Sequence, residues 1–121
     1  MAQSVVVLEK DLKLARHIAG GLRSYFSVLI ALSGDELREN VARNHPEAVI
    51  LDIENWRLTD VERLHRDFPE MPIVCTHRIP DDELWTAALT AGACDVCPAD
   101  DVQVVLTSVL RNLAAQTVAV A

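Results

Sequence analysis

Short runs of mostly apolar residues recur along the chain and mark where strands are expected. They cover residues 5–8, 28–32, 48–51, 73–75 and, more weakly, 94–97. Within most of these runs the apolar residues follow one another instead of alternating with polar ones. This pattern is typical of strands that are buried on both faces, as in a parallel sheet.

Helical periodicity fills the segments between these runs. Apolar residues recur there at a spacing that places them on one face of a helix. They are Leu12, Ala15, Ile18, Ala19 and Leu22 in the first such segment, Leu58, Val61, Leu64 and Phe68 in the third, and Val102, Val105, Leu106, Val109 and Leu113 in the last. Ser33 and Glu36 spell a capping box at the start of the second helix, and Gly92 is expected to end the fourth.

The alternation of strands and helices predicts the fold. Five expected strands alternate with five expected helices, and the connections are short. Such a chain forms an α/β, three-layer doubly wound (βα)5 domain. Its five-stranded parallel sheet has helices on both faces and the strand order 2-1-3-4-5. The length of 121 residues suits one such domain, which we expect to span residues 1–121.

Charge and composition narrow the classes of function. The formal net charge is -7 and the pI is about 4.9, so no basic surface is expected to follow a nucleic-acid backbone. No apolar run is long enough to span a bilayer, and the N-terminus lacks the layout of a signal peptide. The three cysteines form no disulfide pattern, which fits a reducing compartment. We therefore expect a cytoplasmic domain that binds neither nucleic acid nor membrane.

Acidic residues follow the first and third predicted strands. Glu9 and Asp11 follow the first, and the third ends at Asp52 with Glu54 close behind. These two strands are neighbours in the predicted order, and their carboxyl ends form the crevice where such sheets bind ligands. Clustered carboxylates suit Mg²⁺, and an Asp beside such a cation can act as a nucleophile that forms an aspartyl phosphate. The plainer alternative is that these acids are solvated loop residues.

Several segments resemble the receiver domain of bacterial two-component response regulators, a chemotaxis-type domain with a flavodoxin-like fold. The resemblance runs from residue 5 to about residue 113. The segments that carry it are Val-Val-Val-Leu-Glu-Lys-Asp from Val5, Pro-Glu-Ala-Val-Ile-Leu-Asp-Ile-Glu from Pro46, Pro-Ile-Val from Pro72, and Ala-Gly-Ala-Cys-Asp from Ala91. No single segment is specific, but their order and spacing together resemble the family.

The resemblance implies a role in phosphorelay signalling. Asp52 falls on the position that accepts a phosphoryl group from a histidine kinase, and Glu9 falls on the first acid of the Mg²⁺-binding pair. Glu54 falls where the family supplies a backbone carbonyl to the metal. A receiver is a signalling domain and not an enzyme, and its usual partner or dimer surface combines the fourth helix, the fifth strand and the fifth helix. Most receivers are joined to an output domain, so residues 113–121 are expected to begin a linker.

The chain departs from the family pattern at several site positions. Lys10 replaces the second metal-binding acid. The hydroxyl residue at the end of the fourth strand aligns with His77, while Thr76 lies one place early. No Lys precedes Pro98, and Val96 stands where the family has an aromatic switch residue. We therefore expect an atypical receiver with an incomplete Mg²⁺ site, in which Lys10 is a candidate to replace the metal as the counter-charge of Asp52.

Two other functions stay open at this point. A pseudo-receiver would work without phosphorylation, as a protein-interaction or dimerisation module. A metal or redox sensor would use Cys75, His77 and Cys97, with Cys94 completing a Cys-x-x-Cys. Residues three apart on a strand point to opposite faces, so small buried cysteines are the better explanation.

Three further residues are candidates for a role near the site or at a partner surface. Trp85 lies among alanines in the fourth predicted helix, where a large aromatic side chain suits a partner surface. Trp56 follows Asp52 in the next loop, where it either packs on the strand edge or gates the site. Arg78 is a candidate to pair with Asp52 or Glu54, the alternative being a solvated loop residue.

Overall fold

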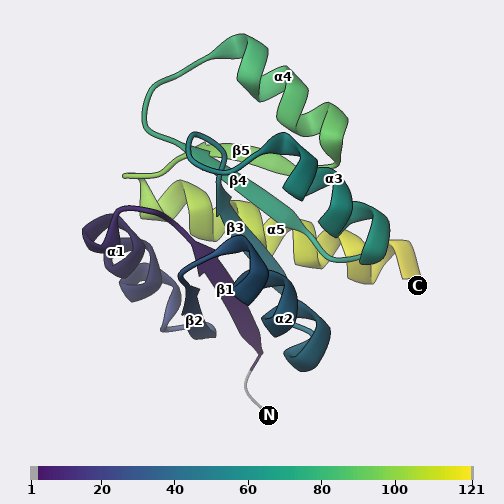
Figure 1. The fold of residues 1–121 in the computed structure, drawn as a ribbon. Coiled ribbons are helices and arrows are strands. Elements are labelled where there is room, and N and C mark those ends of the chain that lie inside the picture. The colour runs from purple at the N-terminus through teal and green to yellow at the C-terminus, as the bar shows by residue number, and fades with distance from the viewer. Residues whose placement is uncertain (1–2, 121) are drawn as a thin grey trace.

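Strands and helices alternate along the chain, as the apolar pattern predicts (Figure 1). The computed structural model describes the backbone of residues 3–120 and the side chains of residues 3–116. The elements are β1 (Ser4–Leu8), α1 (Leu12–Leu22), β2 (Ser27–Ala31), α2 (Gly34–Asn44), β3 (Ala48–Asp52), α3 (Leu58–Asp67), β4 (Ile73–His77), α4 (Asp82–Ala91), β5 (Asp95–Pro98) and α5 (Val102–Val120). Each predicted strand is present, with small shifts at its ends.

The strands form one parallel sheet in the order β2-β1-β3-β4-β5, which confirms the predicted topology. Helices α1 and α5 cover one face of the sheet, and α2, α3 and α4 cover the other (Figure 1). The chain leaves β1 for β2 on one side, while β3 lies on the other side of β1. The loops after β1 and β3 therefore diverge and leave a crevice at the carboxyl ends of these two strands.

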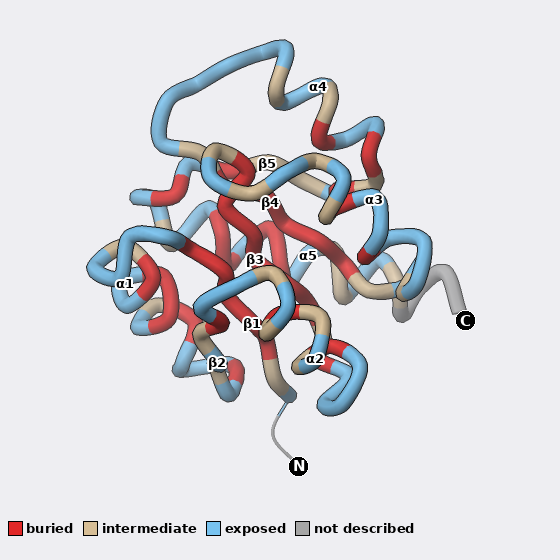
Figure 2. The backbone as a smooth tube through the Cα atoms, viewed as in Figure 1, coloured by how far each residue is buried: buried red, intermediate tan, exposed pale blue. Residues whose placement is uncertain are grey.

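Each layer of helices packs on its own hydrophobic core. Successive residues of a strand enter opposite cores, as Val7 and Leu8 of β1 do. Every residue of β3 is buried (Figure 2), as expected of a central strand with helices on both sides. Close packing around β1 and β3 holds the ends of both strands, and hence the crevice, in fixed positions.

Side-chain caps set where the helices begin. Asp11 caps α1 by accepting hydrogen bonds from two backbone N–H groups of its first turn. Ser33 caps α2, and its hydroxyl accepts from the N–H of Glu36 at 3.1 Å, as the predicted capping box requires. The Glu36 carboxylate in turn accepts from Leu32, one residue before the cap.

The sequence pattern predicts the end of α4 correctly, but it predicts the burial of the first residue of α1 wrongly. Gly92 ends α4 as predicted, at a φ of 120° that other residues rarely adopt. A Cβ at Gly92 would lie 2.5 Å from the His65 ring, so the end of α4 packs closely on α3.

Leu12 is predicted on the buried face of α1, but its side chain is 49% exposed. It is the first residue of the helix and precedes the turns that pack on the sheet.

The last helix continues through the segment expected to begin a linker. Helix α5 runs without a break from Val102 to Val120. A connection to an output domain beyond it stays a prediction. Among the described residues, no helix has the length and apolar character needed to cross a bilayer.

Candidate functional site

Two buried acidic side chains, Glu9 and Asp52, meet in the crevice between β1 and β3. Asp52 ends β3, and Glu9 directly follows the last residue of β1. Leu8 and Leu51 are paired across these strands, so the next residues, Glu9 and Asp52, lie side by side. Their exposed fractions are 5% and 2%. The structure thus brings together the two acids that the strand order placed at this edge.

Hydrogen bonds from the loop after β3 hold the Asp52 carboxylate. The backbone N–H of Glu54 donates to Oδ1 at 2.9 Å, and the side-chain amide of Asn55 donates to Oδ2 at 2.6 Å. Across the crevice, the backbone N–H of Asp11 donates to Oε2 of Glu9 at 3.2 Å. The contact of Asn55 was not expected from the sequence. Its only signal there is an amide three residues after Asp52, a spacing that a turn can bring back to the carboxylate.

The proximity of the two carboxylates changes how Glu9 titrates. Burial, hydrogen bonding with Asp52 and the negative charge of Asp52 together raise the pKa of Glu9 from 4.5 to about 7. Backbone N–H groups near Glu9 offset only part of this rise. Near neutral pH the Glu9 carboxyl is therefore protonated for much of the time, and a cation that binds to Glu9 must displace that proton.

Asp11 and Glu54, the other acids expected in the pocket, use their carboxylates elsewhere. Asp11 is exposed and caps α1. Glu54 accepts a hydrogen bond from the backbone N–H of Ile79 at 2.9 Å and lies 3.5 Å from the Arg78 guanidinium. Partial burial acts to raise the pKa of Glu54, but the bonds from Ile79 and Arg78 outweigh it and lower this pKa. Glu54 therefore ties the loop after β3 to the loop after β4.

Among the described residues, no basic side chain forms an ion pair with either of the two acids. Lys10 is exposed, and none of the ion pairs found in the described part of the chain includes Lys10, Glu9 or Asp52. The expected pairing of Lys10 with Asp52 is thus not seen in this conformation. Two adjacent carboxylates suit Mg²⁺, which takes one or two such ligands and keeps several waters. No group of three or more His, Cys, Asp or Glu side chains among the described residues is placed to hold a metal, so water or backbone would complete the shell.

Comparison with solved structures places this geometry in a known fold. No protein-family model matches the sequence, and no curated protein matches it. A CheY-like response regulator receiver domain protein from Methanospirillum hungatei JF-1 superposes with a TM-score of 0.85 at 16% identity, over 97% of this chain and 98% of that one. A response regulator from Thermotoga maritima gives 0.84 at 19% identity, over 94% of this chain and 99% of that one. The chain has the fold of response-regulator receiver domains. NtrX from Brucella abortus contains the same fold within a longer chain, with a TM-score of 0.81 at 23% identity over 98% of this chain and 28% of that one.

Within this receiver fold, the strand positions beside Asp52 carry small uncharged side chains. Thr76 of β4 is paired with Asp52, and Cys97 of β5 is paired with Thr76. Both side chains are buried, and the Thr76 hydroxyl has no hydrogen-bond partner. Burial raises the pKa of the Cys97 thiol to about 11, so the thiol is neutral. Strand β5 therefore offers no positive charge to a group attached to Asp52.

His77 and Val96 lie on the α4 side of the receiver fold. Together with Trp85 and Pro80 they line a hollow of about 240 Å³ beside the start of α4. The His77 Nδ1 atom is buried there without a hydrogen-bond partner, and Trp85 is 48% exposed. Pro98 ends β5 at the surface. The structure thus leaves the Trp85 side chain exposed on the surface where the resemblance expects a partner.

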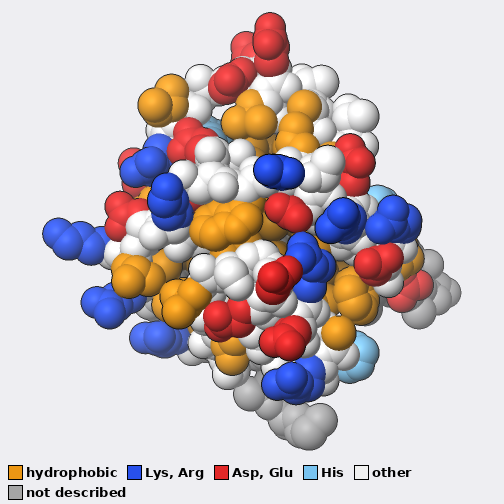
Figure 3. Space-filling view, in the orientation of Figure 1, with side chains coloured by type: hydrophobic (Ala, Val, Ile, Leu, Met, Phe, Trp, Pro, Cys, Tyr) orange, Lys and Arg blue, Asp and Glu red, His pale blue; other side chains and the backbone are white. Residues whose placement is uncertain are grey.

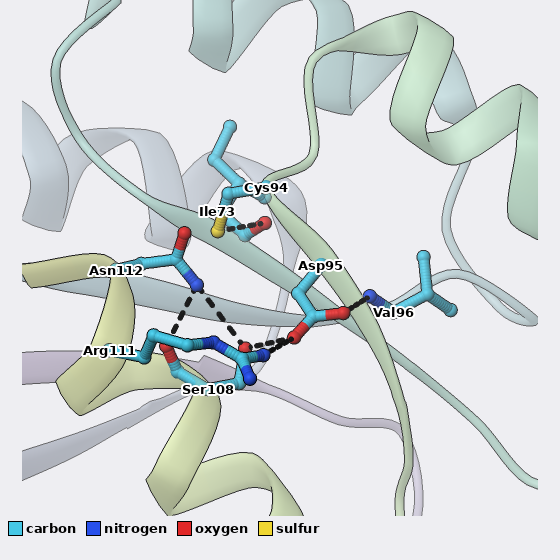
Figure 4. Close-up of polar contacts among 7 residues, drawn as sticks. All are labelled: Ile73, Cys94, Asp95, Val96, Ser108, Arg111 and Asn112. Atoms are coloured by element: carbon cyan, nitrogen blue, oxygen red, sulfur yellow. Dashed lines mark hydrogen bonds and ion pairs between the residues drawn. The ribbon is translucent and has the colours of Figure 1, made fainter. Parts of the chain in front are cut away.

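A polar network fastens β5 to α5 (Figure 4). The Asp95 carboxylate accepts a hydrogen bond from the Ser108 hydroxyl at 2.5 Å and pairs with the Arg111 guanidinium at 3.1 Å. Asn112 donates to the backbone carbonyl of Ser108 at 2.8 Å. The network therefore holds the start of β5 against α5.

The cysteines of the receiver fold do not gather into one site. Cys75 lies in the core under α2, α3 and α4, and Cys97 lies in the core under α1 and α5. Cys94 precedes β5, and its thiol donates to the backbone carbonyl of Ile73 at 3.3 Å (Figure 4). All three are free. Cys97 is buried as expected, but Cys94 is exposed, which corrects the expectation of a buried cysteine there, because it lies just before β5. Partial burial of its thiol raises the pKa of Cys94 to about 11. The structure therefore gives no support to a metal or redox sensor built on Cys75, His77 and Cys97.

Trp56 packs toward the start of α2. It is half-buried against the core under α2, α3 and α4. With Gly34 and Arg38 it lines a hollow of about 330 Å³ at the start of α2. This position agrees with the packing alternative for Trp56.

Proposed function

We propose that the chain is a response-regulator receiver in two-component signalling, in which Asp52 accepts a phosphoryl group from a histidine kinase. The observation that carries this proposal is the buried pair of Glu9 and Asp52 at the switch point of the sheet, to which no cationic side chain of the described part of the chain is paired. Such a pair attracts a hard cation, and Glu9 and Asp52 are the side chains that would hold Mg²⁺. The receiver fold supports the same function.

The chain's own groups prepare Asp52 for this reaction. The N–H of Glu54 and the amide of Asn55 hold the two carboxylate oxygens in a fixed orientation. An Asp52 oxygen attacks the phosphorus, the bond from phosphorus to the kinase imidazole nitrogen breaks, and that nitrogen leaves with the bonding electrons and takes up a proton. A bound Mg²⁺ would supply positive charge to the phosphoryl oxygens, a contribution that the neutral Cys97 and Thr76 cannot make.

A route for the signal leads from Asp52 to α4 through Glu54. A phosphoryl group on Asp52 would compete with the hydrogen bonds that Glu54 and Asn55 donate to its carboxylate. The Glu54 carboxylate accepts a hydrogen bond from the backbone N–H of Ile79. A shift of Glu54 would therefore move the loop that leads into α4. Such a coupling would bias the α4 surface without an aromatic residue at Val96.

Intact-mass spectrometry tests the acceptor role. After incubation with Mg²⁺ and a small acyl-phosphate donor, the chain is expected to gain one phosphoryl group, and Asp52→Asn is expected to abolish the gain. Asp11→Asn is the matched control, because Asn caps a helix about as well as Asp and the Asp11 carboxylate serves only as a cap. An adduct that persists in Asp52→Asn would contradict the proposal.

The second candidate is a pseudo-receiver that binds a partner without phosphorylation. The unpaired Lys10, the neutral Cys97 and the missing aromatic residue at Val96 favour it. A folded chain that gains no phosphoryl group from the donor, and whose partner binding is unchanged in Asp52→Asn, would favour this alternative. In either case we propose a cytoplasmic signalling protein as the partner.

Trp85 is proposed as part of the partner surface that combines α4, β5 and α5. Because its side chain is 48% exposed, Trp85→Ala is expected to lower the free energy of unfolding by less than about 1 kcal/mol. The same change should weaken binding of the partner, because exposed aromatic residues are frequent anchors of interfaces. Thermal unfolding and a binding titration measure the two effects. A large fall in Tm with unchanged binding would instead make Trp85 a core residue.

A further inference from the structure

The edge of the sheet at β2 lacks the features that usually keep an exposed strand from pairing with another chain. β2 is bonded only to β1, so one side of its backbone faces away from the sheet (Figure 1). An edge strand of this kind leaves the N–H and C=O groups of alternate residues without partners in their own sheet. Charged side chains, prolines or bulges normally protect such an edge.

The segment around β2 is uncharged and apolar at the surface. From Ser24 to Gly34 the sequence contains no charged residue and no proline, in a chain whose net charge is -7. The side chains of Tyr25, Leu29 and Leu32 are exposed. In Figure 3, hydrophobic side chains are visible at the surface around β2, with Lys, Arg, Asp and Glu side chains of neighbouring elements among them. The opposite edge strand, β5, is different, because it carries Asp95 and ends in Pro98.

We propose that β2 pairs with β2 of a second copy of this chain, in antiparallel orientation, so that the two sheets continue into one. The backbone N–H of Ser27 points toward β1, because it donates to Gln3. Along a strand, the backbone N–H and C=O groups of successive residues point alternately to the two sides. The N–H and C=O groups of Val28 and Ile30 therefore point away from β1, toward the open edge of the sheet. A two-fold axis at Leu29 pairs Val28 of one copy with Ile30 of the other, and each residue then both donates and accepts.

Charge at the two ends of the segment fits the same orientation. The segment follows the basic residue Arg23 and precedes the acidic residues Asp35 and Glu36. Within the chain, Asp35 pairs with Arg38 and Glu36 accepts a hydrogen bond from Leu32, so these acids would share their charge with Arg23 of the second copy. An antiparallel pair brings the basic end of one copy beside the acidic end of the other, whereas a parallel pair would place like charges together. The antiparallel arrangement is also symmetric, so one surface serves both copies. This dimer would leave the surface of α4, β5 and α5 free for a different partner.

Two matched substitutions test the proposal by analytical ultracentrifugation over a concentration series. Around the proposed axis the Leu29 side chains lie directly opposite each other, so Leu29→Lys places two ammonium groups in contact and should raise the dimer Kd by about tenfold or more. Leu89→Lys on α4 is the control, because Leu89 is 42% exposed and Leu29 is 41% exposed. We expect a dimer for the unmodified chain and for Leu89→Lys. A monomer at millimolar concentration, or a dimer that dissociates only in Leu89→Lys, would overturn the proposal.

Amide hydrogen exchange of the unmodified chain tests the same contact without any substitution. The outward N–H groups of Val28 and Ile30 are expected to exchange more slowly as the protein concentration rises, while the N–H groups of α4 stay unchanged. This measurement decides the question if Leu29→Lys fails to fold or if both variants dissociate. Exchange at Val28 and Ile30 that does not depend on concentration would overturn the proposal.

Discussion

Glu9→Gln is expected to make the chain more stable at pH 8 while leaving its stability near pH 5 almost unchanged. The folded state raises the pKa of Glu9 from 4.5 to about 7, so folding favours its protonated form. The protonated Glu9 carboxyl is compatible with burial, so the folded state keeps its full stability below pH 4.5. Part of this stability is lost as the pH rises from 4.5 to about 7, because Glu9 must then ionise inside the fold. A shift of this size corresponds to at most about 3 kcal/mol, and glutamine, which is always neutral, does not incur this loss.

Urea unfolding at a series of pH values, in buffer with a metal chelator, measures the effect. We expect the unmodified chain to lose about 2–3 kcal/mol of unfolding free energy between pH 5 and pH 8, and Glu9→Gln to lose much less. Glu54→Gln should behave in the opposite way: because the folded state lowers the pKa of Glu54, its removal costs stability at neutral pH and less in acid. An equal pH dependence in Glu9→Gln and in the unmodified chain would show that Glu9 is not the titrating group.

Lys10→Asp is expected to tighten Mg²⁺ binding by about tenfold or more, which corresponds to about 1.4 kcal/mol. Lys10 directly follows Glu9 and forms no ion pair, so the change removes a free positive charge beside the crevice and adds a carboxylate there. Both effects favour a divalent cation.

Calorimetric titration with Mg²⁺ measures the affinity, and Trp56 fluorescence offers a second signal because Trp56 follows Asn55, which contacts Asp52. Lys13→Asp is the matched control: it changes the charge equally, and Lys13 is also exposed in the first turn of α1. If both variants bind Mg²⁺ equally well, the gain reflects net charge alone and Lys10 has no special place at the site.

The fold was predictable because its signals are local. Each buried strand is an apolar run, and short connections between alternating strands and helices allow only a parallel, doubly wound sheet. The ends of strands were harder to predict than the strands themselves. For example, β5 was predicted to begin at Cys94 but begins at Asp95. Polar residues at strand ends carry no apolar signal, so pairing with β4 decides where β5 begins.

The site was predictable only in part. The strand order predicts that Glu9 and Asp52 lie close together, because β1 and β3 are neighbours and parallel strands have their carboxyl ends at the same end of the sheet. The directions of the neighbouring side chains do not follow from it. Asp11 turns to cap α1 and Glu54 turns to Ile79, because each finds free backbone N–H groups nearby. The raised pKa of Glu9 depends on its burial, and the sequence does not show that a residue in the loop after β1 is buried.

The most direct test of the proposed function is to identify the residue that carries the phosphoryl group. The chain is labelled with a radioactive acyl-phosphate donor and Mg²⁺, cleaved into peptides, and each labelled peptide is treated with hydroxylamine. We expect a single labelled peptide that contains Asp52, with label that hydroxylamine releases as from an acyl phosphate. Label on a peptide that contains His77 but not Asp52, or label that Asp52→Asn retains, would contradict the assignment of Asp52 as the acceptor.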